Sequence, residues 1–165
     1  MTIDSEGNLI TVGIFKKSIH FDSGDSIYSL EAYSSNNNYF ILKQDSIGNV
    51  LWFSTGQGAC EYNAHDVKCD SDDNIYLAGD YTGVGDFNFS DTVSTESSSY
   101  GGDDGFLLKL NKDGEFVWVK FFQGIFYKNR DERCKSLFIK DSAIYIWLEN
   151  LKARLMLTRQ IQLSL

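Results

Sequence analysis

Most of this chain is built from short apolar runs separated by polar turn segments. Residues 106–110 and 116–122 are rich in β-branched and aromatic side chains, and their pattern repeats every two residues rather than every 3.6. The segment 111–114 between them carries Asn, Asp and Gly, which together signal a tight turn. These runs therefore predict a β-hairpin. No comparable helix signal occurs before the C-terminal tail.

The same hairpin pattern occurs earlier, at residues 39–54 around a turn at 45–49. A second hairpin pattern precedes each one. In the later copy it consists of 67–69, a turn at 70–74, and 75–78. Each copy therefore predicts four antiparallel strands joined by tight turns, and the fold class is all-β.

The two copies align without a gap at a spacing of 66 positions. The matched pairs are Asp4 with Asp70, Asn8 with Asn74, Gly13 with Gly79, Phe21 with Phe87, Phe40 with Phe106, Lys43 with Lys109, Gly48 with Gly114, and Trp52 with Trp118. A partial third copy follows, with 137–139 on 67–69 and 144–146 on 75–77. The predicted organisation is a first blade-like repeat at 1–66, a second at 67–132, a partial third at 133–150, and a non-repeat tail at 151–165.

A long polar stretch separates the second and third strands of each repeat, at 14–38 and at 80–104. Because structureless loops of this length are uncommon in compact domains, we expect a short additional strand around 86–89 and a surface excursion.

Tandem four-stranded units suggest propeller blades. The segment from Asp70 through Asn74, Tyr76 and Gly79 to Gly83 also resembles the opening of the bacterial β-propeller repeat family called SBBP. Residues 85–87, 102–110 and 113–118 continue that pattern, and the resemblance covers about residues 1–147. The first copy departs from it at 38–39, where the acidic-glycine lead into the third strand is missing.

The resemblance implies a partial propeller and a secreted or cell-surface location, and it implies no particular chemistry. A closed propeller needs about four to eight blades, whereas about two and a half are present here. We therefore expect a piece of a longer array, or a unit that self-associates through open blade edges.

Composition excludes several classes of function. The 165 residues contain 15 Lys and Arg against 23 Asp and Glu, a net charge of −8, which disfavours a nucleic-acid surface. No apolar window approaches the 18 residues of a transmembrane helix, and residues 1–7 do not have the pattern of a secretory signal.

Candidate catalytic and metal-binding residues are few. Cys60, Cys69 and Cys134 fit no disulfide framework or zinc spacing and are interpreted as unpaired small hydrophobic residues, although one pair could form. The two histidines, His20 and His65, lie in no nucleophile motif, and the group of Cys60, His65 and Asp66 is interpreted as a loop grouping. No catalytic, cofactor-binding or metal-binding residue is assigned.

Two further groups have a tempting functional interpretation and a simpler structural one. The acidic residues at 70–74, and Asp86 with Asp103 and Asp104, offer oxygen ligands for calcium. In a hairpin turn, however, Asp and Asn are favoured for bonding their own backbone. Aromatic residues of the fourth strands could stack on sugars, but their recurrence favours packing between blades. They are Trp52, Phe53, Trp118, Phe121 and Phe122.

The tail at 151–165 is Leu-rich, basic and free of acidic residues, with partly alternating apolar positions. Two interpretations of this tail remain: a segment that caps the repeat array, and a non-homologous end left by truncation. For the chain as a whole, the sequence favours a non-enzymatic binding or scaffolding module for a protein or glycan partner. The alternatives are a fragment of a polysaccharide-acting lyase or hydrolase, and a truncated remnant without an independent role.

Overall fold

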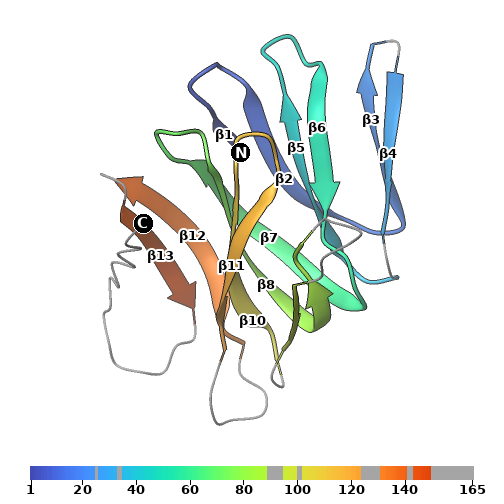
Figure 1. Ribbon diagram of the computed structural model, residues 1–165. Helices are drawn as coiled ribbons and strands as arrows, with labels where there is room; N and C mark the ends of the chain where they lie inside the picture. Colours follow the sequence, from blue (N-terminus) through green and yellow to red (C-terminus); the bar gives the residue numbers. More distant parts are fainter. Residues whose placement is uncertain are drawn as a thin grey trace.

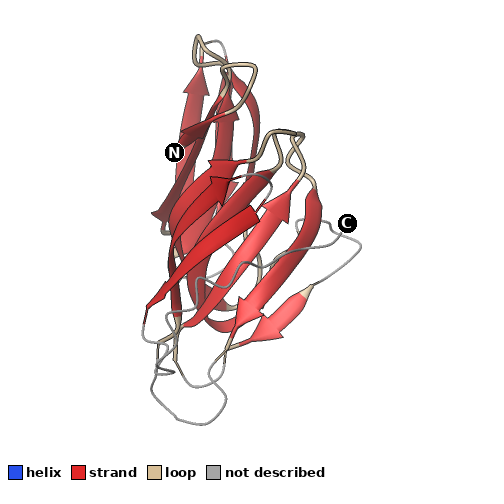
Figure 2. Cartoon of the chain, turned by 90° about the vertical axis from the view of Figure 1, so that its left-hand side faces the viewer, coloured by secondary structure: helices blue, strands red, loops and turns tan. Residues whose placement is uncertain are grey.

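The computed structural model describes residues 1–24, 26–32, 35–88, 95–99, 102–123, 131–140 and 143–149. Within these ranges every regular element is a β-strand and none is a helix (Figure 2), so the predicted all-β class is confirmed. The tail at 151–165 lies outside the described residues.

The first sheet contains four antiparallel strands in the order β1-β2-β5-β6. Their bounds are Thr2–Ile3 (β1), Leu9–Phe15 (β2), Asn38–Gln44 (β5) and Val50–Thr55 (β6). Between β2 and β5 the chain forms a separate hairpin of β3 (Ser18–Ser23) and β4 (Ser26–Glu31). This hairpin lies at one end of the molecule (Figure 1), and its Phe21 packs against Phe53 of β6, with ring centroids 5.7 Å apart.

The second sheet repeats this order as β7-β8-β10-β11. The bounds are Cys60–Cys69 (β7), Ile75–Asp86 (β8), Asp104–Leu110 (β10) and Phe116–Phe122 (β11). Strand β7 continues across the expected boundary between residues 66 and 67. Four antiparallel strands in tandem are thus confirmed for the first two units.

The additional strand expected around 86–89 was placed wrongly. Strand β8 stays extended to Asp86 because its end pairs with a short strand further along, β9 (Glu96–Ser98), in the register Val84 with Ser98. The Asp86 carboxylate then accepts hydrogen bonds from the backbone N–H groups of Asn88 and Thr95, which closes the excursion.

The third unit has two described strands, β12 (Arg133–Lys140) and β13 (Ala143–Glu149), paired as a hairpin. The sheets stack in the same way twice: β7 packs against β1, β2 and β5, and β12 packs against the equivalent strands β7, β8 and β10. In Figure 1 the units follow one another from β3–β4 at one end to β12–β13 at the other.

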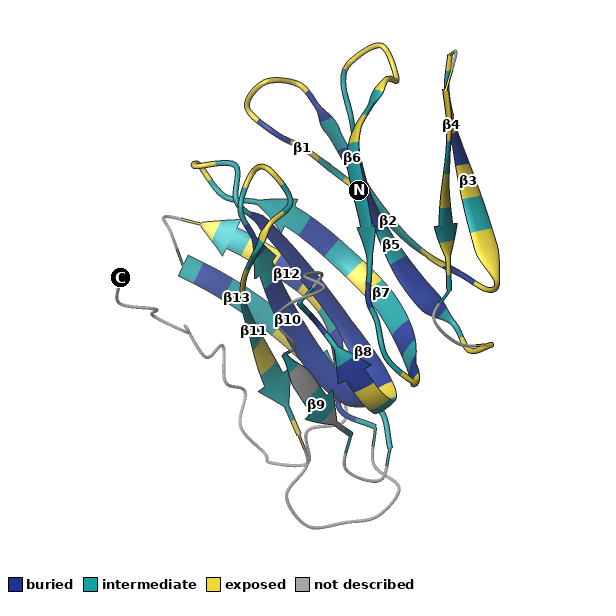
Figure 3. Ribbon diagram, turned by 45° about the vertical axis from the view of Figure 1, so that its right-hand side comes forward, coloured by how far each residue is buried: buried dark blue, intermediate teal, exposed yellow. Residues whose placement is uncertain are grey.

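Among the described residues, two apolar clusters fill the spaces between the sheets. The larger lies between the first and second sheets and includes Tyr39, Ile41, Tyr62 and Phe106, all fully buried. The smaller joins the second sheet to the third unit through Leu107, Leu137 and Ile144, among others. Strands β8 and β10 are accordingly the most deeply buried (Figure 3).

Candidate functional site

A cleft with a volume of about 170 Å³ opens between the first and second sheets, at the end where their tight turns meet. The β1–β2 turn, strands β5 and β6, and the β7–β8 and β10–β11 turns all contribute to it. The lining residues are Asp4, Glu6, Asn8, Lys43, Leu51, Trp52, Asp73, Lys112 and Asp113. This cleft is the best candidate for a site in the described part of the chain.

The turns that frame the cleft share one construction. The first residue of each turn is Asp or Asn, and its side chain accepts hydrogen bonds from two backbone N–H groups further along. In the β1–β2 turn, for example, Asp4 Oδ1 accepts from Glu6 N at 3.0 Å and from Asn8 N at 2.8 Å. These bonds satisfy backbone donors that the sheet leaves unpaired. The same construction occurs in the turns that begin at Asp45, Asp70 and Asn111.

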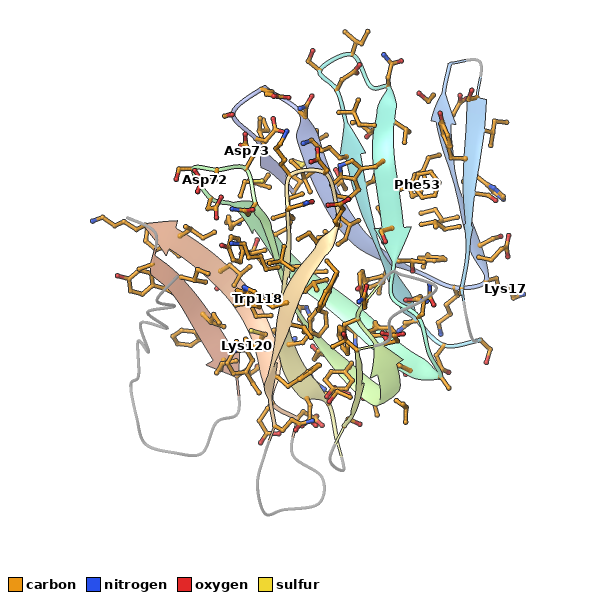
Figure 4. The ribbon with its side chains drawn as sticks, viewed as in Figure 1. Lys17, Phe53, Asp72, Asp73, Trp118 and Lys120 are labelled. Carbon is orange, nitrogen blue, oxygen red and sulfur yellow. The ribbon has the colours of Figure 1, made fainter. Side chains whose placement is uncertain are left out.

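The fourth turn position has a positive φ in each case. It is occupied by Gly7, Gly48 and Gly114 in three turns, but by Asp73, with φ 62°, in the β7–β8 turn. A non-glycine residue is unusual in this conformation. Here its carboxylate accepts hydrogen bonds from Ser5 N at 2.8 Å and Ser5 Oγ at 2.6 Å, across the cleft. Asp73 therefore links the turns of two sheets, and Figure 4 shows it on the side of its turn that lies near the first sheet.

The floor of the cleft holds a buried ion pair. Lys43 Nζ lies 2.8 Å from Asp4 Oδ2, and the two side chains are 8% and 1% exposed. Burial alone would raise the pKa of the Asp4 carboxyl, but hydrogen bonds from Lys43 and Asn8 outweigh it and lower this pKa to about 2. Lys43 also donates to the backbone oxygen of Lys112 at 3.1 Å, so it bridges the first sheet to the β10–β11 turn of the second.

The fourth-strand tryptophans pack between sheets, as their recurrence predicted. Trp52 packs against the cluster between the first two sheets, and Trp118 packs against the cluster that joins the third unit. Gly114, in the β10–β11 turn, lies directly on the Trp52 indole. A Cβ atom at this glycine would come within 2.9 Å of the indole ring. Phe121 and Phe122 join these two clusters respectively, whereas Phe53 contacts the β3–β4 hairpin.

The polar groups named above are engaged with one another. The buried cation of the cleft is neutralised by Asp4, and the Asp73 carboxylate is occupied by Ser5. Burial raises the pKa of the Cys60 thiol to about 12 and that of Cys69 to about 11, so both thiols stay protonated near neutral pH. Burial raises the pKa of Cys134 as well. All three cysteines are free, as the sequence favoured.

His65 and its neighbours were expected in a loop, and this expectation was wrong. His65 and Asp66 lie within strand β7, next to the bulge between Ala64 and Asp66. His65 Nε2 contacts the buried carboxylate of Asp80 and lies 3.1 Å from Lys135 Nζ of β12. Cys60 belongs instead to the cluster on the side of the first sheet. His20 lies on β3, opposite Ser29.

Several of the acidic residues considered as calcium ligands have other partners in the structure. Asp70 accepts from its own turn, which joins β7 to β8, and from the Tyr76 hydroxyl at 2.9 Å. Asp103 pairs with Arg133 at 2.6 Å. Asp104 pairs with Tyr81 of β8, and Asp86 lies five residues further along that strand. Asp86, Asp103 and Asp104 therefore do not surround one point. Among the described residues no cluster of three metal-ligating side chains occurs.

The Asp4–Lys43 pair was not among the candidates that the sequence pattern indicated. Lys43 follows three apolar residues in a predicted strand, and its equivalent is Lys109. A cation repeated at an interior position is a signal for a buried partner. Which carboxylate provides it depends on how the sheets stack, and the sequence pattern does not contain that information.

Comparison of the chain with models of known protein families and with curated protein sequences finds no match in either case. Within the ranges listed above, the structure contains no helix with the length and apolarity needed to cross a membrane.

Proposed function

We propose that this chain is a β-propeller-like repeat module that binds or scaffolds a protein or glycan partner and catalyses no reaction. The observation that carries the proposal is the repeated stacking, in which β7 lies on the first sheet as β12 lies on the second. Stacked units of this kind form a rigid frame from which turns and loops project toward partners.

The polar groups of the cleft support the non-catalytic part of this proposal. General acid–base catalysis needs a group that can exchange protons near neutral pH. Asp4 has a pKa lowered to about 2 and is held by Lys43, so it stays ionised and paired. Residues that are used to join two sheets are poorly suited to bind and release a substrate.

The SBBP resemblance and the charge support the rest of the proposal. The resemblance favours a secreted or cell-surface protein that carries a larger array of such units. The net charge of −8 argues against nucleic acid as the partner. Further copies of the 66-position pattern beside this coding region would support a module, and their absence would favour a remnant.

One observation favours a glycan as the partner. The outer face of β12–β13 presents Phe138, 57% exposed, and Trp147, 69% exposed, with Tyr145 packed beside Phe138 at 5.9 Å. Exposed aromatic rings on one side of a hairpin are suited to stacking on sugar rings. The same face would serve the alternative, a fragment of a polysaccharide-acting enzyme.

A glycan array and a cross-linking pull-down, run with the same purified chain, test the proposal. We expect saturable binding in one of them and no cleavage of any glycan bound. Replacing Trp147 with Ala should abolish glycan binding, whereas replacing the exposed Ile27 of β4 should not. Turnover of a polysaccharide would overturn the non-enzymatic assignment, and no binding in either assay would overturn the binding role.

A further inference from the structure

Strand β13 differs from its equivalents in how its edges are used. In the first two units the second strand is paired on both sides: β2 lies between β1 and β5, and β8 lies between β7 and β10. β13 is the second strand of the third unit by the alignment of 144–146 with 75–77. Among the residues that the structure describes, it pairs with β12 alone. Figure 1 shows it at the outer end of the stack.

The surface beneath this edge is also covered differently. Where the second sheet covers the first, the β10–β11 hairpin supplies Gly114 on the Trp52 indole and the Lys112 carbonyl for Lys43. The equivalent residues on the second sheet are Trp118 and Lys109. The described third unit ends at Glu149 and holds no strands equivalent to β10 and β11, so neither residue receives that cover from it. Lys109 instead lies with its Nζ 5.2 Å above the Tyr76 ring.

The edge of β13 has no partner strand among the described residues, and the surface of the second sheet around Trp118 and Lys109 lies beyond it. Both features call for the same kind of ligand. Edge strands bind extended segments by main-chain hydrogen bonds, and side-chain pockets beside the edge set the specificity. Here those pockets would take the inward-facing apolar residues of a strand, and a tight turn would have to reach Lys109 and Trp118. The interface between the first two sheets shows a hairpin that meets both requirements.

We propose that the edge of β13 opposite β12 binds a β-hairpin of another chain that carries this repeat, a hairpin with the pattern of β10–β11. Its first strand would add antiparallel to β13, and its turn would place a glycine over Trp118 and a carbonyl near Lys109. The inference rests on the proposed binding function and names the partner class for one surface.

The test uses the full chain and a synthetic peptide of residues 104–122, which form the β10–β11 hairpin. Hydrogen–deuterium exchange is followed in residues 143–149, and affinity is measured by titration calorimetry. We expect the amides of β13 to exchange at least about tenfold more slowly at saturating peptide, because strand addition closes their edge. Peptide binding to the full chain should be saturable with a stoichiometry of one.

Two matched peptides distinguish strand addition from general adhesion. Phe106 and Leu108 are fully buried against the neighbouring sheet, so lysine at both positions should weaken binding by at least about tenfold. Val117 is 45% exposed, and lysine at that position should leave binding unchanged. On the full chain, Lys109→Met should weaken binding by a smaller factor, because it removes the contact to the turn carbonyl.

Three results would overturn the inference. They are unchanged exchange in β13 on addition of peptide, equal binding of the Phe106/Leu108 peptide, and slow exchange of β13 in the free chain, which would mean that the edge is already occupied. If the chain still binds a glycan or protein in the assays above, the proposed function survives any of these results. If those assays also fail, both proposals fall.

Discussion

Lys43 and Lys109 occupy equivalent positions on the third strands of the first and second sheets, but only Lys43 forms a buried ion pair. Lys43 reaches Asp4 at 2.8 Å, whereas Lys109 lies over the Tyr76 ring. The equivalent carboxylate, Asp70, is engaged by the Tyr76 hydroxyl at 2.9 Å. In the first sheet the residue that aligns with Tyr76 is Ile10, which offers no hydroxyl.

The two sheets thus engage equivalent charged residues differently, and they also differ at the neighbouring position, which is Ile10 in the first and Tyr76 in the second. Asp4 Oδ2 accepts from Lys43, and Asp70 Oδ2 accepts from Tyr76, so each carboxylate is satisfied in its own way. The neighbouring sheet contributes as well, because Lys43 donates to the Lys112 carbonyl in the β10–β11 turn of the second sheet. The repeat therefore fixes the strands and turns, while the polar contacts depend on which residue and which sheet lie opposite.

The largest expected effect comes from removing one member of the buried pair. Asp4→Ala leaves the Lys43 ammonium buried without its counter-charge and should destabilise the chain by about 3–5 kcal/mol. Asp70→Ala, the matched control, removes the turn bonds and the bond from the Tyr76 hydroxyl but leaves no buried charge without its partner, and it should cost about 1–2 kcal/mol. Urea denaturation followed by tryptophan fluorescence measures both. Equal losses would show that the Asp4–Lys43 pair adds nothing beyond the turn.

The contact between Gly114 and Trp52 can be tested with a second matched pair. Gly48→Ala introduces a side chain at φ 93° with nothing within 4 Å, and it should cost about 1 kcal/mol. Gly114→Ala has a similar φ and also meets the Trp52 indole, so it should cost about 2–3 kcal/mol. The difference between the two losses of unfolding free energy measures how tightly the second sheet packs on the first. No difference would mean that the indole moves aside freely.

The strands, the hairpins and the repeat could be predicted from the sequence because they depend on local patterns. Alternation and turn residues marked β5, β6, β10 and β11 closely. The strand at Glu96–Ser98 could not be found in this way, because it exists only through pairing with the end of β8. The strand position of His65 was also missed, because its contacts with Asp80 of β8 and Lys135 of β12 depend on how strands far apart in the sequence come together.

Acid should weaken the Asp4–Lys43 ion pair of the first sheet more than the contact between Lys109 and Tyr76 in the second sheet. The pKa of Asp4 is lowered to about 2 in the folded chain from an ordinary value of 3.8, so its contribution is complete above about pH 4 and is lost as the pH falls toward 2. We expect the unfolding free energy to fall over this window. The fall should be shallower in Asp4→Asn, which cannot ionise. An equally steep fall in that variant would assign the effect to other carboxylates.

The residue at position 76 can be tested by a double-mutant cycle. In the natural chain, Asp70→Asn and Lys109→Met should show a coupling below about 0.5 kcal/mol, because the two side chains are linked only indirectly, Asp70 at the Tyr76 hydroxyl and Lys109 at the Tyr76 ring. In a Tyr76→Ile background, which imitates the first sheet, we expect a coupling of about 1 kcal/mol between them. Additivity in both backgrounds would show that the sheet stacking, and not Tyr76, keeps Lys109 from its carboxylate.

The smallest effect is expected at Asp73, where two terms oppose each other. Asp73→Gly removes the cost of a positive φ, about 1 kcal/mol, and also removes the two hydrogen bonds from Ser5. The net change should lie within about 1 kcal/mol of zero. Asp73→Ala keeps the unfavourable backbone and loses the same bonds, so it should destabilise the chain by about 1–2 kcal/mol more than the glycine variant. Ser5→Ala retains one of the two bonds, since the Ser5 N–H still donates, and its loss should be intermediate. If glycine proves clearly stabilising, the link between the two turns contributes less than the strain it imposes, and another interaction must hold this end of the sheets together.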